Sequence, residues 1–251
     1  MATKEPDYVP HHAMVIDQNR CIGCWTCAVG CKQMNNEPLG IFWNRVLTTS
    51  PNESSTAKAP ASPNIDVPRG VFPDLERAYL PLACQHCNDA PCVKVCPVQA
   101  TFRRDDGTIL IDYERCIGCR YCIAACPYGV RTFNWGEAEY APGGIVGYGE
   151  DYRTTAVVPY ENEGHLVFMP ERPMGVVEKC TFCVERIDKG EKPFCVEVCP
   201  VGARVFGDLN DPNSEVSQMV NEDGAARLLD ELGTEPNVYY IPVRKSVTRE
   251  N

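Results

Sequence analysis

Sixteen cysteines constrain this 251-residue chain more than any other feature, because they form four groups of four with none left over. We call these groups quartets one to four, and they are Cys21, Cys24, Cys27, Cys31; Cys84, Cys87, Cys92, Cys96; Cys116, Cys119, Cys122, Cys126; and Cys180, Cys183, Cys195, Cys199. Quartet three has the spacing C-x2-C-x2-C-x3-C-P. Three such thiolates in a tight loop can wrap one metal cluster, while the fourth faces a neighbouring cluster.

This spacing is the one found in bacterial ferredoxins, so the sequence predicts iron–sulfur clusters. At four thiolates per cluster, the sixteen cysteines predict four [4Fe–4S] clusters and are all expected to be ligands. Gly118 lets the backbone of quartet three approach its cluster without a Cβ atom. A disulfide framework suits short secreted chains, which this chain is not. Structural zinc suits only quartet four, and the other three quartets favour a cluster there as well.

The formal net charge of −10 argues against a nucleic-acid partner, because phosphate binding requires basic patches. No uninterrupted apolar stretch is long enough to cross a bilayer, so we expect no transmembrane helix in this chain. The first ten residues contain neither an apolar signal region nor a twin-arginine pair. We therefore expect no export signal of its own, and export would depend on a partner.

An internal repeat relates the quartets in pairs. The stretch Val15–Cys24 matches Leu110–Cys119, so quartets one and three are copies of one unit. The stretch Cys92–Ala100 matches Cys195–Ala203, so quartets two and four are copies of another. Apolar runs beside the quartets predict strands at Met14–Asp17, Ala100–Arg104, Thr108–Asp112 and Ala203–Gly207. The residues Asp105-Asp106-Gly107 are typical of a hairpin turn.

The repeat predicts an α+β fold with two pseudo-twofold-related ferredoxin-like modules, each holding two [4Fe–4S] clusters, and loop-rich insertions. Module A comprises residues 1–32 with 175–210, and module B comprises residues 81–133. In module A, Met14–Asp17 should pair with Ala203–Gly207, about 190 residues later.

The remaining segments are predicted to be less regular. Residues 33–80 and 134–174 are two insertions expected to be ordered loops and subunit contacts, with polar Ser50–Pro68 in the first and Tyr148, Tyr152 and Tyr160 in the second. Residues 211–251 are expected to form C-terminal helices and a tail. The expected elements are a helix at Glu215–Val220 capped by Asp211–Ser214, a helix at Gly224–Leu232, a strand or arm at Asn237–Val243, and a tail at Arg244–Asn251.

The exchange of the fourth cysteine between neighbouring clusters predicts four ligand sets. We call them group I (Cys21, Cys24, Cys27, Cys199), group II (Cys180, Cys183, Cys195, Cys31), group III (Cys84, Cys87, Cys92, Cys126) and group IV (Cys116, Cys119, Cys122, Cys96). His86 is expected to pack near a cluster rather than bind iron, because a Rieske centre needs two histidines. His11 and His12 are expected at the surface, and Trp25 and Tyr121 are expected to shield clusters from water.

The chain resembles the iron–sulfur electron-transfer subunits (beta subunits) of the dimethyl sulfoxide reductase superfamily. The shared motifs are Leu82–Cys87 with Pro91-Cys92, Cys126–Gly129, Phe133–Trp135, and Glu178–Cys183. Some relatives have tryptophan at one cysteine of quartet three and hold a three-iron cluster. Because Cys119 is present here, the resemblance implies four-iron clusters throughout.

The resemblance implies a non-catalytic subunit that relays single electrons during anaerobic respiration. Its partners would be a molybdenum or tungsten bis-pterin catalytic subunit and a quinone-linked membrane subunit or another redox partner. The complex would be membrane-associated and exported with a twin-arginine-bearing partner, with a cytoplasmic complex as the alternative. Two other functions remain open at this point, namely a subunit of a hydrogenase or formate hydrogenlyase-like complex and a free soluble polyferredoxin.

Overall fold

The computed structural model describes residues 8–49, 69–71, 74–76, 78–136, 159–168 and 172–243. Its helices are α1 (Thr26–Met34), α2 (Pro91–Lys94), α3 (Tyr121–Ala125), α4 (Val184–Ile187), α5 (Phe194–Glu197), α6 (Glu215–Glu222) and a 3-10 helix at Asp230–Leu232. Its strands are β1 (His12–Asp17), β2 (Arg45–Thr49), β3 (Arg69–Val71), β4 (Asp74–Glu76), β5 (Ala78–Leu82), β6 (Thr101–Arg103), β7 (Ile109–Ile111), β8 (Thr132–Phe133), β9 (Tyr160–Asn162), β10 (His165–Phe168), β11 (Val177–Glu178), β12 (Arg204–Asp208), β13 (Ala226–Arg227) and β14 (Val238–Ile241). The predicted features at Ser50–Pro68, Tyr148, Tyr152 and Arg244–Asn251 lie outside the described residues.

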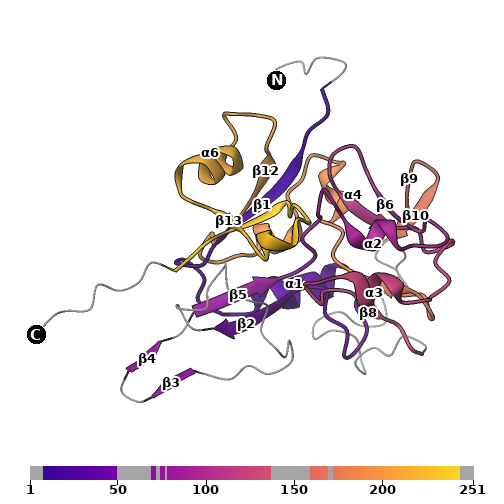
Figure 1. Ribbon diagram of the computed structural model, residues 1–251, viewed down its shortest axis with the longest axis horizontal. Helices are drawn as coiled ribbons and strands as arrows, with labels where there is room; N and C mark the ends of the chain where they lie inside the picture. Colours follow the sequence, from indigo (N-terminus) through magenta and orange to yellow (C-terminus); the bar gives the residue numbers. More distant parts are fainter. Residues whose placement is uncertain are drawn as a thin grey trace, which may run out of the picture.

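A four-stranded sheet, in the order β12-β1-β14-β13, joins the two ends of the chain (Figure 1). Strands β1 and β12 are antiparallel, with Met14 opposite Phe206 and Ile16 opposite Arg204. The predicted pairing of Met14–Asp17 with Ala203–Gly207 is therefore confirmed. Strand β14 lies parallel to β1 along its other edge, so Asn237–Val243 is a strand within the sheet rather than a free arm.

Helix α6 covers one face of this sheet and confirms the predicted helix at Glu215–Val220, with two more residues at its end. The hydroxyl of Ser214 caps it by accepting a hydrogen bond from the backbone amide of Ser217, at 3.1 Å. Val216 is fully buried and packs in one cluster with Ala13 and Val15 of β1 and with Tyr239 of β14. The C-terminal segment therefore completes the core of module A.

The predicted helix at Gly224–Leu232 is wrong. Instead, Ala226 lies opposite Tyr240 in the short antiparallel pair β13–β14, and only a 3-10 turn follows it. Leu229 has φ 52°, a left-handed conformation that interrupts any helix. Leu228 and Leu229 are buried but Leu232 is half exposed, so the leucine spacing reflects packing against the sheet.

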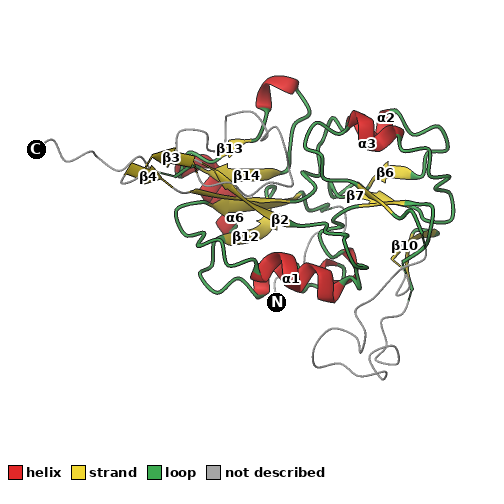
Figure 2. Cartoon of the chain, turned by 90° about the horizontal axis from the view of Figure 1, so that it is seen from below, coloured by secondary structure: helices red, strands yellow, loops and turns green. Residues whose placement is uncertain are grey.

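Module B contains the predicted hairpin. Thr101 of β6 lies opposite Ile111 of β7, and Gly107 in the connecting turn has φ 85°, which favours glycine. Leu110 on β7 is fully buried against Val167 of β10 and Val184 at the start of α4. Figure 2 shows β6, β7, α2 and α3 gathered on one side of the molecule and the four-stranded sheet with α6 on the other.

The insertions contain more regular structure than predicted. Strands β2 and β5 pair over five residues, from Arg45 opposite Leu82 to Thr49 opposite Ala78. In the second insertion, β9 and β10 form a hairpin in which Asn162 lies opposite His165. Both pairs were missed because neither segment alternates apolar and polar residues cleanly, so cross-strand pairing determines their conformation.

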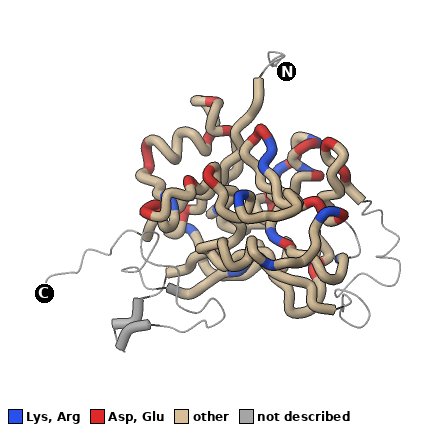
Figure 3. Tube along the Cα trace, turned by 45° about the vertical axis from the view of Figure 1, so that its right-hand side comes forward, with Lys and Arg blue, Asp and Glu red and all other residues tan. Residues whose placement is uncertain are grey.

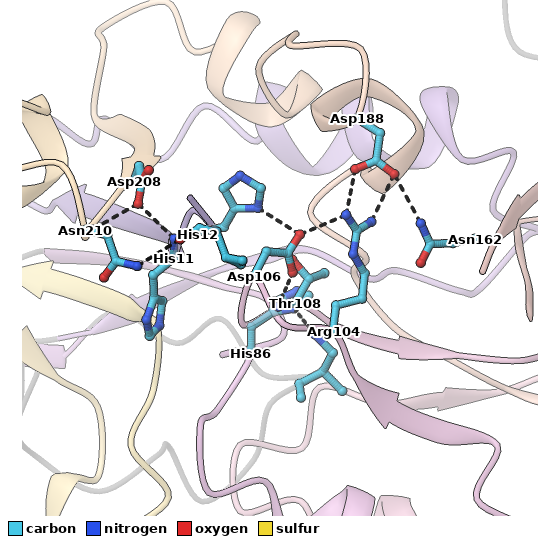
Figure 4. A network of polar contacts seen from close by, with 12 residues as sticks. His11, His12, His86, Arg104, Asp106, Thr108, Asn162, Asp188, Asp208 and Asn210 are labelled. Atoms are coloured by element: carbon cyan, nitrogen blue, oxygen red, sulfur yellow. Dashed lines mark hydrogen bonds and ion pairs between the residues drawn. The ribbon is translucent and has the colours of Figure 1, made fainter. Parts of the chain in front are cut away.

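A polar network connects the two modules (Figure 4). His12 of β1 contacts Asp106 in the module B turn, with 3.2 Å between Nδ1 and Oδ2. The guanidinium of Arg104 lies 3.0 Å from Asp106 and 2.8 Å from Asp188, which follows α4. The prediction that His12 is a surface residue is therefore wrong, since its side chain is 16% exposed, and His11 is also half-buried.

Acidic residues gather on the outer turns of the trace, whereas several basic residues lie on central segments (Figure 3). Within the described part of the chain, no helix combines the length and apolar character needed to cross a membrane.

Candidate iron–sulfur cluster sites

Quartets one and three lie in tight loops that end at a helix. In these loops Gly23 has φ 69° and Gly118 has φ 70°, and the residues before the helices, Trp25 and Arg120, are also left-handed. A Cβ atom on Gly118 would lie 2.2 Å from the carbonyl oxygen of Gly175. The first two cysteines of each quartet therefore lie in a curled loop, the third lies on the first turn of the helix, and Cys31 and Cys126 come from α1 and the end of α3.

Quartets two and four use short helices that start beside a proline. Pro91 is the first residue of α2, and Pro193 immediately precedes α5. Proline is favourable at these positions because the first amides of a helix have no intrahelical partner. Each helix holds the third cysteine of its quartet, Cys92 or Cys195, on its first turn.

A buried cavity of about 480 Å³ lies where quartet four meets α1. Its lining includes Cys180, Cys183 and Cys195 together with Cys31, whose position in sequence is about 150 residues away. Trp43, Phe182, Arg204 and Cys84 of quartet two also line it. These four cysteines of quartet four and α1 are the predicted group II.

A second cavity of about 330 Å³ lies under the loop of quartet one. Its lining includes Cys21, Cys24 and Cys27 together with Cys199, which are the predicted group I. Arg204 also lines this cavity, so its side chain stands between the two cavities.

The module B cysteines also cluster across quartets. Burial raises the pKa of the Cys87 thiol to about 12, and Cys84, Cys92 and Cys126 raise it as well because they are close enough to interact electrostatically. These four are the predicted group III. Cys122 interacts with Cys116 and also with Cys92 of quartet two. In the predicted group IV, Cys119 is exposed, and Cys96 and Cys116 are half-buried.

The donors suit clusters held by thiolates. All sixteen cysteines lie in described segments and are free thiols. Burial raises the pKa of the Cys180 thiol to about 12, so thiolates at these positions require bound metal or nearby cations. Among the described residues, no three Cys, His, Asp or Glu side chains are close enough to hold a single metal ion. A cubane cluster holds each thiolate on a different iron and so spaces its ligands more widely than one ion does.

Three buried cations near the cysteines were missed by the sequence reasoning. Arg204, Arg131 and Lys179 are 4%, 6% and 1% exposed. The ammonium of Lys179 donates to the carbonyl oxygens of Ile109 and Cys180, and thereby joins the two modules. A usable signal existed for the arginines, since each stands five residues after the last cysteine of a quartet.

A second buried polar group packs beside the clusters. The guanidinium of Arg172 forms an ion pair with Glu178 and donates to the hydroxyl of Tyr113 at 2.9 Å. It also stacks over Trp43, 4.8 Å from the ring centroid. This group ties both insertions to β11. Burial also raises the pKa of the nearby Glu37 carboxyl to about 7.

His86 is fully buried, accepts a hydrogen bond from the amide of Ile109 at 3.0 Å, and stacks on Phe182. This geometry shows the packing that was predicted for His86. Trp25 is half-buried and lines the group I cavity, as expected of a shielding residue. Tyr121 is 64% exposed, so its side chain is not packed in the core.

The fold and the four cysteine groups define an iron–sulfur protein of the dicluster ferredoxin class. The family described as "4Fe-4S dicluster domain" matches residues 75–141 and 152–209. The chain is 48% identical, over 92% of its length and 79% of the relative, to a protein of Halobacterium salinarum named as an iron–sulfur subunit of a dimethyl sulfoxide reductase. It is 38% identical to a selenate reductase subunit of Mesobacillus selenatarsenatis, over 96% of this chain and 75% of that one. It is 39% identical to the iron–sulfur subunit of the arsenate respiratory reductase of Shewanella sp. strain ANA-3, over 91% and 94%.

The chain therefore belongs to the iron–sulfur electron-transfer subunits of the dimethyl sulfoxide reductase superfamily. It carries four [4Fe–4S] clusters, and its role is electron transfer. When bound, the clusters supply one-electron carriers, while the protein supplies thiolates, exclusion of water and the fixed charges that set the potentials.

Proposed function

We propose that this chain relays single electrons between a molybdenum or tungsten bis-pterin catalytic subunit and a quinone-linked membrane subunit. The observation that carries the proposal is similarity to the iron–sulfur subunits of respiratory reductases over more than nine-tenths of the chain. Substrate chemistry takes place on the catalytic subunit. This chain contributes the electron path and the surfaces that hold the path against its partners.

Each cluster is held by three cysteines of one quartet and the last cysteine of another, in groups I to IV as defined above. The two cavities support groups I and II, because each is lined by the complete set of four. The electrostatic coupling of Cys126 with Cys84 and Cys87 supports group III. The matching spacing of quartets one and three supports group IV by analogy.

The two modules are related by a pseudo-twofold axis. The antiparallel β1–β12 pair of module A and the antiparallel β6–β7 pair of module B support this relation, because both join the strand after a quartet to the strand before one. Lys179, which hydrogen-bonds to both modules, lies at their junction. Electrons pass in sequence through groups I, II, III and IV, in either direction.

The exposed apolar residues beside the outermost loops are the partner contacts. Ile22 lies in the loop of quartet one and is 57% exposed, and Ile117, its counterpart in quartet three, is 64% exposed. Trp135 of the second insertion is 74% exposed, with the guanidinium of Arg120 stacked 4.4 Å from its ring centroid. A permanent subunit requires such surfaces, whereas a free carrier needs little beyond its cluster core. The complex is membrane-associated and is exported with a partner that carries a twin-arginine signal.

Anaerobic co-purification from native cells, with metal analysis, tests the partner. Molybdenum or tungsten with a large pterin-binding chain is the expected result. Nickel would instead assign the chain to a hydrogenase complex, and iron and sulfide on an unaccompanied monomer would indicate a free carrier. A Trp135→Ala variant should release the partner while keeping its full iron content.

Pairs of cysteine substitutions test the ligand groups. Cys199→Ala and Cys24→Ala should each remove about a quarter of the iron, because each destroys one cluster of four. Combined, they should remove no more, since both belong to group I. Cys199→Ala combined with Cys183→Ala should remove about half. The grouping is wrong if the first pair loses half of the iron and the second only a quarter.

A further inference from the structure

Arg204 and Arg131 stand at the same distance from a quartet but are not equivalent positions of the repeat, because Arg204 follows quartet four and Arg131 follows quartet three. Each stands five residues after the last cysteine of a quartet, Arg204 as the first residue of β12 and Arg131 just before β8. Quartets one and two have Asn36 and Thr101 at that distance. Each module therefore has one arginine for its two quartets. The hydroxyl of Thr101 accepts a hydrogen bond from Arg131 at 3.4 Å.

Arg204 lies between the two cavities of module A and lines both. One guanidinium nitrogen is 3.7 Å from the sulfur of Cys195, in group II. The other donates to the amide oxygen of Asn44 at 2.9 Å. Burial lowers the pKa of Arg204, but Cys27 of group I and Cys195 outweigh burial and the net pKa is raised. Arg204 therefore faces sulfur from both groups.

Arg131 is buried and interacts electrostatically with cysteines of both groups of module B. Burial lowers its pKa, but Cys92, Cys122 and Cys84 outweigh burial and the net pKa is raised. Cys92 and Cys84 belong to group III and Cys122 to group IV. One terminal nitrogen of this guanidinium, Nη2, has no hydrogen-bond partner within the described residues.

Neither arginine forms an ion pair with a carboxylate in the part of the chain that the structure describes. A buried, permanently charged guanidinium is costly unless negative charge lies nearby. Thiolate-ligated clusters supply that charge, and they become more negative on reduction. A fixed positive charge therefore favours the reduced form and raises the reduction potential.

We propose that Arg204 and Arg131 are counter-ions, each shared by the two clusters of its module, and that each raises the potentials of both clusters together. The proposal rests on the ligand groups proposed above. One arginine per module is sufficient because it lies between two clusters. Neighbouring potentials are thereby kept matched, which keeps single-electron steps inside a module reversible.

Redox titration of the cluster-loaded full chain, followed by electron paramagnetic resonance, tests the proposal. Arg204→Gln should lower two of the four midpoint potentials and leave two unchanged. Arg131→Gln should lower the other two, and the double variant all four. Arg204→Lys and Arg131→Lys should restore most of each shift, because they keep the charge. Arg20→Gln, which removes a side chain 56% exposed to solvent beside module A, is the matched control and should shift none.

Iron and sulfide content is measured on every variant, so that altered loading is separated from altered potential. If the Arg204→Gln variant does not take up its clusters, Asn44→Asp is used instead. This change places a carboxylate next to the Arg204 guanidinium and should lower the same two potentials. A shift of one potential, of all four, or of none at full loading would overturn the proposal. The cysteine pairs above test the ligand groups through iron content alone, so the two failures are distinguishable.

Discussion

Module A and module B use similar cysteine spacings but close in different ways. In module B, five residues separate the end of β6 at Arg103 from the start of β7 at Ile109. In module A, 186 residues separate the end of β1 at Asp17 from the start of β12 at Arg204. Loop-closure entropy scales as 1.5RT ln n, so the longer closure costs about 3 kcal/mol more.

The structure offsets this cost where it arises. Module A gains β14 and β13 beside β1, and α6 buries Val216 against the sheet. Module B closes with the two-stranded β6–β7 pair, packed on β10 and α4. Residues 211–243 therefore stabilise module A, whose two halves lie far apart in sequence.

The largest effect should come from a buried charge in residues 211–243. Val216→Asp places a carboxylate in the Val15–Tyr239 cluster and should cost about 5 kcal/mol or more. We expect the β1–β12 pairing to fail. About half of the iron should then be lost, because module A holds two of the four clusters. Iron content and guanidinium unfolding measure both effects.

Val167→Asp is the matched change beside module B, since Val167 of the second insertion is also buried and packs on Leu110 of β7. The module B hairpin closes locally, so the module B clusters should persist despite lower stability. Val29→Asp, at a residue 55% exposed on α1, should change neither quantity. Equal iron loss from Val167→Asp and Val216→Asp would show that closure length is not what distinguishes the modules.

A smaller effect, shared by both modules, should follow from breaking the buried Arg172–Glu178 pair. Glu178 lies on β11, which pairs with β8 where module B ends and module A resumes. Glu178→Gln removes the carboxylate that pairs with the buried Arg172 guanidinium and should cost about 3–5 kcal/mol. We expect a single unfolding transition whose midpoint lies at a lower denaturant concentration than in the wild type.

The double variant Arg172→Leu with Glu178→Leu should recover part of this loss, because it leaves no unpaired charge. If Glu178→Gln destabilised only one set of clusters, the pair would not be a junction between modules.

The repeated glycines give a direct comparison of the two cluster loops. Gly23 and Gly118 both have positive φ, so alanine at either costs about 1–2 kcal/mol in backbone strain. The added Cβ meets the Gly175 carbonyl at 2.2 Å in module B, but the side chain of Tyr79 at 2.4 Å in module A. A side chain can rotate away and a packed backbone cannot, so Gly118→Ala should be the more destabilising. Thermal loss of visible absorbance ranks the two, and the opposite order would contradict this reasoning.

Local and repeated patterns were sufficient to predict much of this molecule. The cysteine spacing and the match of Val15–Cys24 to Leu110–Cys119 predicted the β1–β12 pair, and Ser214 marked the start of α6. Leu229 shows why the rest could not be predicted, because its left-handed turn follows from pairing with β14.

The same limit applies to the site. The proposed groups I and II follow from a spacing rule that relates cysteines of different quartets, so the sequence was sufficient to predict them. The contact of Arg172 with Trp43 joins residues about 130 positions apart, and no local pattern connects them. The arginines at five residues past a quartet were visible in the sequence, but the position of Arg204 between two cavities was not.

The smallest effect concerns Asp106 in the polar network that joins the modules, and it depends on pH. Burial alone would raise the pKa of Asp106, but hydrogen bonds from His12 and the Thr108 amide and the charge of Arg104 outweigh burial, so the pKa lies below the usual 3.8. The folded protein therefore binds this proton less readily than the unfolded chain. The stabilisation is complete above the unfolded pKa and is lost as the pH falls through the folded one.

Asp106→Asn should lower stability at pH 7 by about 1 kcal/mol or less, since the network is partly exposed. The difference between the wild type and this variant should stay constant from pH 7 to about pH 5 and shrink below about pH 4. Measuring the difference cancels the acid sensitivity that the clusters give to both proteins. A gap that widened on acidification would mean that Asp106 is protonated more readily in the folded state, and that the contact between modules does not rest on its charge.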